Sequence, residues 1–209
     1  MWTTAAKIIC SIMVLECTII SIGNIFTIYV FWTNRKRLKR ASILLINLAV
    51  ADLLVGLTEL PGIASGTIPQ HFEKGKMMKE TTHDNMTVII PTMFSITSLF
   101  CLVLISLERA YAVIWPLRHR VASKKMYICG TAVVWACGVT VATLLSLNSL
   151  KVFGYTYTMV PVCIMQFSSL VIICISYLSI RTRLQFRAVP AAKHQNRQNN
   201  EEQDRKSVV

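Results

Sequence analysis

Hydrophobic residues along the chain gather in five long blocks, and most charged residues lie between the blocks. Each block is long enough to cross the hydrocarbon core of a bilayer, which takes about 20 apolar residues in a helix. Helices of a soluble protein would instead show a polar face with a period of 3.6 residues. The pattern therefore predicts an all-α fold, a polytopic transmembrane helical bundle in residues 1–180, with spans at residues 8–32, 41–64, 88–115, 126–147 and 158–180.

The end of the chain has a different composition. Residues 181–209 contain no apolar block and are rich in Asn, Gln and charged residues. Such a segment cannot bury enough apolar surface to offset the entropy that folding costs. We expect a polar, disordered tail on the cytoplasmic side.

The distribution of charge fixes an orientation. The chain has 22 Lys and Arg residues and a net charge of +12. Five of these residues lie in the N-terminus and the second and fourth loops, and the other 17 lie in the first and third loops, the tail and the inner end of the third span. The basic side of a membrane protein is cytoplasmic, so we expect an extracellular N-terminus and a cytoplasmic C-terminus, and no nucleic-acid binding. Asn85 begins the triplet Asn85-Met86-Thr87, a candidate glycosylation site in a loop assigned to the outside.

Cysteine and histidine do not form recognisable catalytic or metal-binding motifs. All seven cysteines fall inside the apolar blocks, which disfavours both an extracellular disulfide and a zinc site. The four histidines lie outside the spans. His71, His83 and Asp84 share a loop, but their spacing matches no compact metal site. We therefore expect no enzyme, and no metal or cofactor apart from the sodium ion considered below.

Acidic residues inside the spans are the first functional candidates, because charge in lipid is costly. Asp52 and Glu59 are seven residues apart and share one helical face with Ala49 and Gly56. Small residues on that face let a neighbouring helix come close. A similar stripe is predicted in the first span, formed by Glu16, Ile20, Gly23, Asn24 and Thr27.

Two polar pairs have alternative interpretations. Ser98 lies eleven residues before Arg109 and could face Asp52 at mid-membrane depth, where the two side chains would form either a sodium site or a hydrogen-bonded packing cluster. Glu108 and Arg109 are adjacent at the cytoplasmic membrane edge. They would form either a snorkelling pair that ends the span or a lock between helices.

Several short motifs in the five spans occur in one order and at matching depths. The chain resembles the rhodopsin-like (class A) G-protein-coupled receptors over spans one to five, which implies five of the seven spans of such a receptor. The matching residues are Gly23-Asn24, the run Asn47-Leu48-Ala49-Val50-Ala51-Asp52, Pro61, Glu108-Arg109-Ala110-Tyr111, Pro116-Leu117, Trp135 and Tyr177.

The resemblance implies roles for these residues. Asp52 and Ser98 would belong to a sodium site that stabilises the inactive state. Arg109 would pair with Glu108 at rest, and Tyr177 would stabilise the active state. Polar and packing contacts between helices would come from Asn24, Asn47, Asp52 and Trp135. The partners would be the lipid bilayer, an unknown extracellular ligand and a heterotrimeric G protein, which faces residues 116–125 and the segment after Ile180.

Some positions depart from the family pattern. Ala110 replaces the aromatic residue after the arginine, and Ser169 stands about where the fifth span usually has a proline. Both cysteines of the usual extracellular disulfide are missing, as in melanocortin-like receptors. Pro91 occupies the region where amine receptors carry an aspartate, which disfavours a biogenic-amine ligand.

The length allows two functions. One is a signalling receptor represented by an incomplete chain, which two further spans would complete. The other is a truncated, non-signalling receptor that forms oligomers with full-length receptors, regulates them and is retained in the endoplasmic reticulum. A transporter is disfavoured, because the sequence shows neither inverted repeats nor polar groups on broken helices at mid-membrane depth.

Overall fold

In the computed structural model of the protein, the described residues are 4–34, 41–64, 82–121, 123–149 and 155–207. This part of the chain is helical and contains no strand. The helices are α1 (Thr4–Thr33), α2 (Ser42–Ala64), α4 (Thr82–Ile114), α5 (Pro116–Val121), α6 (Lys124–Ser149) and α7 (Tyr155–Ser207).

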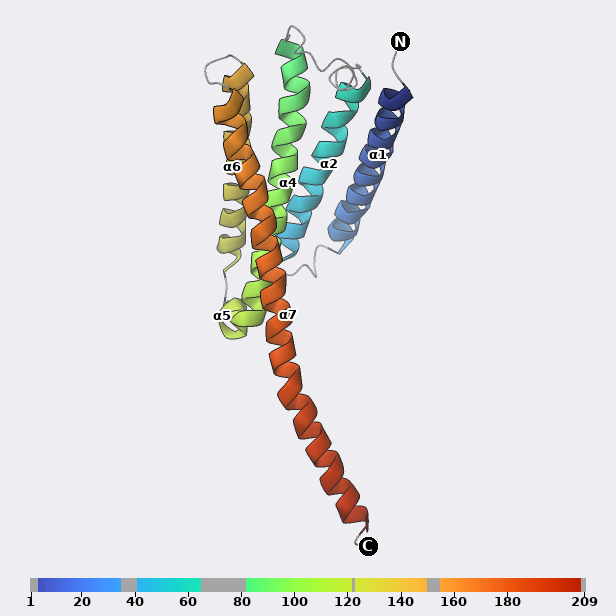
Figure 1. The fold of residues 1–209 in the computed structure, drawn as a ribbon, viewed down its shortest axis with the longest axis vertical. Coiled ribbons are helices and arrows are strands. Elements are labelled where there is room, and N and C mark those ends of the chain that lie inside the picture. The colour runs from blue at the N-terminus through green and yellow to red at the C-terminus, as the bar shows by residue number, and fades with distance from the viewer. Residues whose placement is uncertain (1–3, 35–40, 65–81, 122, 150–154, 208–209) are drawn as a thin grey trace.

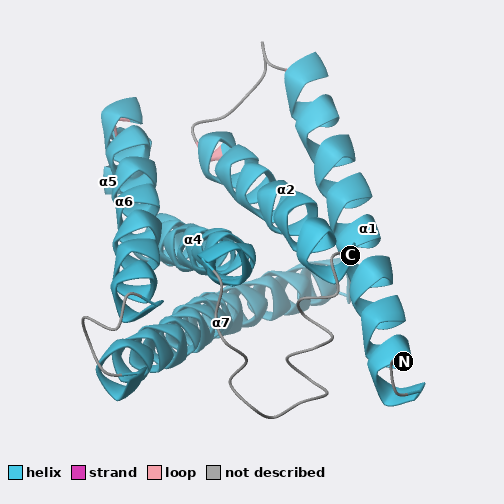
Figure 2. Cartoon of the chain, turned by 90° about the horizontal axis from the view of Figure 1, so that it is seen from above, coloured by secondary structure: helices cyan, strands magenta, loops and turns pink. Residues whose placement is uncertain are grey.

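Five of the helices lie side by side as a bundle, with α4 at its centre (Figures 1 and 2). α4 packs against α2, α6 and α7, whereas α1 packs chiefly against α2. By length and composition, five helical segments could cross a membrane: Lys7–Thr33, Ser42–Ala64, Met86–Ile114, Lys124–Leu147 and Val160–Phe186. The predicted all-α bundle with five membrane spans is confirmed.

The contact between α1 and α2 uses a face of α1 that overlaps the predicted stripe. Cys17 and Ser21 are buried, while Glu16 is exposed and Gly23 has open space around its Cα. Ile20, Asn24 and Thr27 of the predicted stripe are partly buried, so the packed face is centred to one side of that stripe. The close approach comes from Gly56 of α2, where an added Cβ would lie 2.5 Å from Ser21 Oγ.

A second close approach joins α4 to α6. Gly138 of α6 lies against Thr97 of α4, and an added Cβ would collide with Thr97 Oγ1. Toward the N-terminal end of α4, buried side chains of α4, α6 and α7 form one apolar cluster consisting of Ile89, Ile96, Val141, Leu145 and Val162. These contacts fix how α6 and α7 sit on the central helix.

A proline separates α4 from α5. Pro116 lacks a backbone N–H, and a residue that precedes proline is disfavoured in helical conformation, so α4 ends before Trp115. Proline is favoured as the first residue of a new helix, and α5 starts at Pro116. This short helix was not predicted, and it brings the loop after α4 back beneath α6 (Figure 1).

The structure also differs from the disordered tail expected after residue 180. α7 continues as a helix through Ser207 and extends well beyond the bundle (Figure 1). The tail is rich in Gln, Glu, Lys, Arg and Ala, which have high intrinsic helix propensity. A segment without an apolar face can therefore still have a local preference for helix.

Candidate functional site

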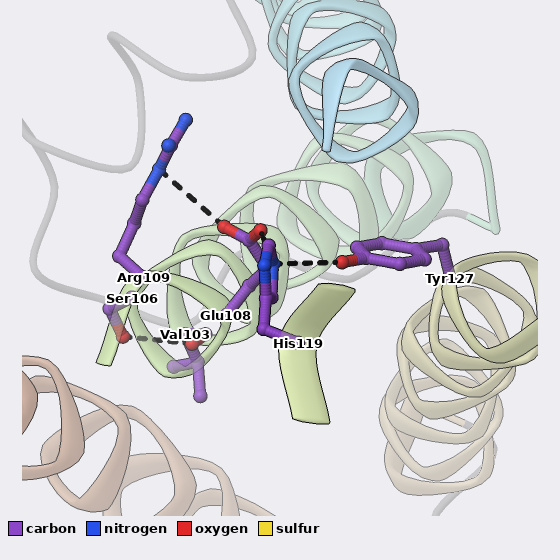
Figure 3. Close-up of polar contacts among 6 residues, drawn as sticks. All are labelled: Val103, Ser106, Glu108, Arg109, His119 and Tyr127. Carbon is purple, nitrogen blue, oxygen red and sulfur yellow. Dashed lines mark hydrogen bonds and ion pairs between the residues drawn. The ribbon is translucent and has the colours of Figure 1, made fainter. Parts of the chain in front are cut away.

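The C-terminal end of α4 and the N-terminal end of α6 meet α5 at a cluster of polar side chains (Figure 3). Glu108 is at its centre, and its side chain is only 8% exposed. Oε2 of Glu108 lies 3.5 Å from Nε of Arg109, and Oε1 lies 2.9 Å from Nε2 of His119. The phenol oxygen of Tyr127 lies 3.3 Å from the same His119 nitrogen. One buried carboxylate therefore joins α4 to α5, and the histidine connects both to α6.

Two oxygens, one of Glu108 and one of Tyr127, lie against the same nitrogen of His119. When Glu108 is ionised its oxygens only accept hydrogen bonds, and Nε2 of His119 is then the donor to Glu108. In that tautomer the Tyr127 oxygen is a second acceptor beside the same N–H. Hydrogen bonds that involve an ionised group are the strong ones, so the contact between Glu108 and His119 is the main link across the cluster.

Aromatic rings surround the histidine. The ring of Tyr111 meets that of His119 edge to face, with 6.2 Å between the centroids, and lies 5.7 Å from the ring of Trp115. Tyr177, the third residue of the predicted activation switch, is 60% exposed on α7. Among the described residues, no hydrogen bond joins Tyr177 to Glu108 or Arg109. The structure brings the acid and the arginine together, and leaves the tyrosine outside their cluster.

The polar pair predicted at mid-membrane depth is in contact. Ser98 Oγ of α4 donates a hydrogen bond to Asp52 Oδ1 of α2. Both residues are half-buried. The pair supplies carboxylate and hydroxyl oxygens, the kind of ligand that hard cations prefer.

A tryptophan joins three helices. Trp135 of α6 donates from Nε1 to Oδ1 of Asn47 on α2, at 3.4 Å. Its ring meets Phe94 of α4 edge to face, with 6.2 Å between the centroids. Asn24, the other predicted inter-helix amide, donates instead to the carbonyl of Ile20 in its own helix, at 2.9 Å.

Some functional contacts were missed by sequence reasoning. His119 on α5, which contacts Glu108, and Tyr127 on α6, which contacts His119, were not predicted, although the proline that starts α5 was a usable signal. Cys17 Sγ donates to Glu59 Oε2 across α1 and α2, at 3.3 Å. Asn85 lies in the first turn of α4, but its side chain falls outside the described residues, as do those of His71, His83 and Asp84.

Comparison with known proteins now adds to this geometry. The sequence pattern of the family "7 transmembrane receptor (rhodopsin family)" matches residues 23–209, most of the chain. The chain belongs to the rhodopsin family of seven-transmembrane receptors. Membership confirms the resemblance carried by the motifs. The family is described as one of membrane receptors, and the relatives of this chain are named as receptors.

Individual relatives of this rhodopsin-family chain differ in their ligands. A 5-hydroxytryptamine receptor 2B from Dichotomyctere fluviatilis is 29% identical over 69% of the chain and 31% of its own length. A somatostatin receptor type 4 from Rattus norvegicus is 36% identical over 51% and 26%. A C3a anaphylatoxin chemotactic receptor from Oncorhynchus mykiss is 34% identical over 68% and 36%. The chain spans about a third of the length of these relatives.

Proposed function

We propose that this chain forms the first five spans of a receptor that reports an extracellular ligand to a heterotrimeric G protein, completed by two further spans. The observation that carries the proposal is the cluster around Glu108. This cluster joins α4, α5 and α6 at their cytoplasmic ends. Glu108 pairs with Arg109 and with His119, and His119 contacts Tyr127 of α6. A signalling receptor needs a group of contacts on its cytoplasmic side that can switch between two arrangements.

The proposed mechanism is the release of Arg109. Its side chain is 54% exposed while that of Glu108 is 8% exposed, so the arginine reaches outward from a buried counter-ion. At rest, Glu108 holds both Arg109 and α5. In the active state, Arg109 leaves Glu108 and binds the G protein, and α5 moves with the segment that contacts the same partner. The carboxylate therefore restrains two elements that the G protein uses.

A test of this proposal measures basal G-protein activation. The protein is expressed at the length that its native transcript encodes, and nucleotide exchange is measured on membranes. Glu108→Gln should raise basal exchange by about tenfold, because the lost charge-assisted contact is worth about 1.5–3 kcal/mol. Glu16→Gln makes the same change on the exposed face of α1 and should leave exchange unaltered. Equal exchange in both variants and the parent protein would contradict the lock.

The class of extracellular ligand is inferred from one position in α4. The names of the relatives include receptors for an amine, a peptide hormone and a complement fragment, so similarity alone selects none of these classes. Pro91 is buried in α4, in the region where amine receptors carry an aspartate. A cationic amine would lack that counter-ion, so we propose a ligand other than a biogenic amine. Screening of amines and peptides for binding tests this.

A second function is favoured by the poorly covered outer helices. The apolar windows of α1 and α7 are only 11% buried, against 22–28% for the three helices between them. These faces could accept two further spans of the same chain, or helices of another receptor. In the second case, the chain would regulate full-length receptors as an oligomer and be retained with them in the endoplasmic reticulum. Surface delivery of a co-expressed receptor separates the cases, since it falls only if the chain traps its partner.

The proposed location is the plasma membrane, with the N-terminus outside. The excess of Lys and Arg in the loops on the other side supports this orientation. An epitope at the N-terminus should be stained on intact cells, whereas one at the C-terminus should require permeabilisation. Glycosylation at Asn85 would agree with the same orientation, and Asn85→Gln should remove the glycan. An N-terminal epitope that is stained only after permeabilisation would contradict the orientation.

A further inference from the structure

An open groove runs along the surface where α4 and α6 pack together, with Leu44 of α2 at one side. Its volume is about 620 Å³, within the range of about 300–1,000 Å³ that is usual for ligand sites. Almost every lining residue is apolar, and Glu108 is its one carboxylate. Among the described residues, none from α1 or α7 lines the groove. The groove is therefore separate from the faces that further helices of the bundle would cover.

The groove lies at the depth of the bilayer. Its lining residues on α4 and α6 fall within the segments Met86–Ile114 and Lys124–Leu147. Its rim carries side chains that are about half exposed: Leu107 at 45%, Met126 at 52% and Val133 at 56%. A groove with an apolar lining at this depth will hold lipid rather than water.

A glycine gives the groove its depth. Gly130 presents no side chain, so the floor is formed by Leu104 of α4, whose Cδ2 would lie 3.0 Å from a Cβ added at Gly130. Cys137, about two helical turns after Gly130 on α6, also lines the groove. A flexible hydrocarbon chain fits a narrow groove of this kind, because it can adapt its torsions to the rim.

The cytoplasmic end of the groove is positively charged. Lys124 and Lys125 are exposed at the start of α6, and Lys125 lies one helical turn before the lining residue Cys129. Arg118 is exposed on the adjacent α5. Glu108 is the acid at this end, and its charge is already engaged by Arg109 and His119. Basic residues at the membrane surface attract the anionic lipids of the cytoplasmic leaflet.

We propose that this groove binds an anionic phospholipid of the cytoplasmic leaflet. One acyl chain lies in the groove above Leu104, and the phosphate-bearing headgroup lies at Lys124 and Lys125. A sterol would fill the apolar part but has no negative charge for the lysines. This proposal does not require that the chain signals, because it depends only on the helices and on the membrane around them.

The experiment uses the natural cysteines as reporters in the complete chain, reconstituted in lipid nanodiscs. Cys137 lines the groove, and Cys174 is exposed on α7. The two lie at a similar depth, because each is about 18–20 Å from the cytoplasmic end of its span at a helical rise of about 1.5 Å per residue. Two variants are made, and both lack the exposed thiols of Cys129 and Cys163. One keeps Cys137 and lacks Cys174, the other keeps Cys174 and lacks Cys137, and the cysteine that is kept carries the fluorophore. Quenching by phosphatidylserine with brominated acyl chains is then compared with quenching by equally brominated phosphatidylcholine.

The expected result is a lipid preference confined to the groove. At Cys137, brominated phosphatidylserine should quench at about one-fifth or less of the concentration that phosphatidylcholine needs, since each basic residue near the surface enriches anionic lipid by about a factor of five. At Cys174, which lies outside the groove, the preference for phosphatidylserine should be much smaller than at Cys137. Lys124→Gln together with Lys125→Gln should abolish the preference at Cys137. The matched pair Arg181→Gln with Arg183→Gln, which removes two exposed charges from α7, should not.

Three results would overturn the proposal. Equal quenching of Cys137 by both lipids would mean that the groove holds bulk lipid or a sterol without regard to charge. Absence of quenching by either lipid would mean that a protein helix covers it. A preference that survives loss of both lysines would mean that the headgroup binds elsewhere. Each result is a ratio measured within one variant, so partial loss of folded protein does not affect it.

Discussion

Glu108 and His119 lie 2.9 Å apart, Oε1 to Nε2, although a helix end and a proline separate them along the chain. The contact ties the short helix α5 to the last turns of α4. Because the carboxylate also pairs with Arg109, the position of α5 and the freedom of the arginine depend on the same side chain.

The first prediction concerns this contact. His119→Ala should lower the free energy of unfolding by about 1–2 kcal/mol, because it leaves a buried carboxylate without one of its donors. His119→Gln keeps an N–H donor and should recover part of that loss. Arg118→Ala, on the exposed side of the same helix, is the control. Thermal unfolding in detergent measures all three, and equal effects of His119→Ala and Arg118→Ala would show that the contact does not stabilise α5.

The second prediction concerns the packing of α6 on α4. Gly138→Ala should destabilise the bundle by about 1–3 kcal/mol, because the new methyl group collides with Thr97 Oγ1. Adding Thr97→Ala should restore much of the stability, since it removes the colliding atom. Gly23→Ala, on an open face of α1, should stay within about 0.5 kcal/mol of the parent protein. If the double variant is no more stable than Gly138→Ala alone, Thr97 is not the obstacle.

The third prediction separates the two contacts of Trp135. Trp135→Phe removes the donor to Asn47 but keeps a ring against Phe94, so it should cost about 0.6 kcal/mol, the average for a hydrogen bond inside a membrane protein. Trp135→Ala removes both contacts and should cost about 3–5 kcal/mol. Denaturation in mixed micelles measures the difference. Similar losses in the two variants would assign the stability to the hydrogen bond instead of the ring.

The number and positions of the spans could be predicted because the bilayer sets both. Each apolar block must reach a fixed thickness, and this requirement acts on each segment alone. The contact of Asp52 with Ser98 was also accessible, since counting back from Arg109 gives the depth and face of Ser98. These features depend on distances along single helices, which the sequence contains directly.

The packing face of α1 and the partners of Glu108 could not be obtained in this way. In lipid, an apolar face gains little by facing another helix instead of acyl chains, so the hydrophobic pattern does not identify the contact face. The predicted stripe runs through Glu16, whereas the packed face is centred on Cys17 and Ser21 and only overlaps that stripe. His119 reaches Glu108 only because Pro116 restarts the chain as a helix in a new direction. Such a pairing depends on loop geometry and not on spacing.

The last prediction decides between the two interpretations of Asp52 and Ser98. If their oxygens hold a sodium ion, exchanging choline for sodium at constant ionic strength should raise the melting temperature of the parent protein. At sodium concentrations ten times the dissociation constant, the stabilisation is about 1.4 kcal/mol. Asp52→Asn should abolish the effect, and Ser98→Ala should weaken it. Glu59→Gln changes another acid of the same helix, bonded to Cys17 instead, and should preserve the effect. A packing cluster predicts the opposite pattern: sodium has no effect on the parent protein, and Asp52→Asn, which resembles a protonated aspartate, leaves stability unchanged or higher.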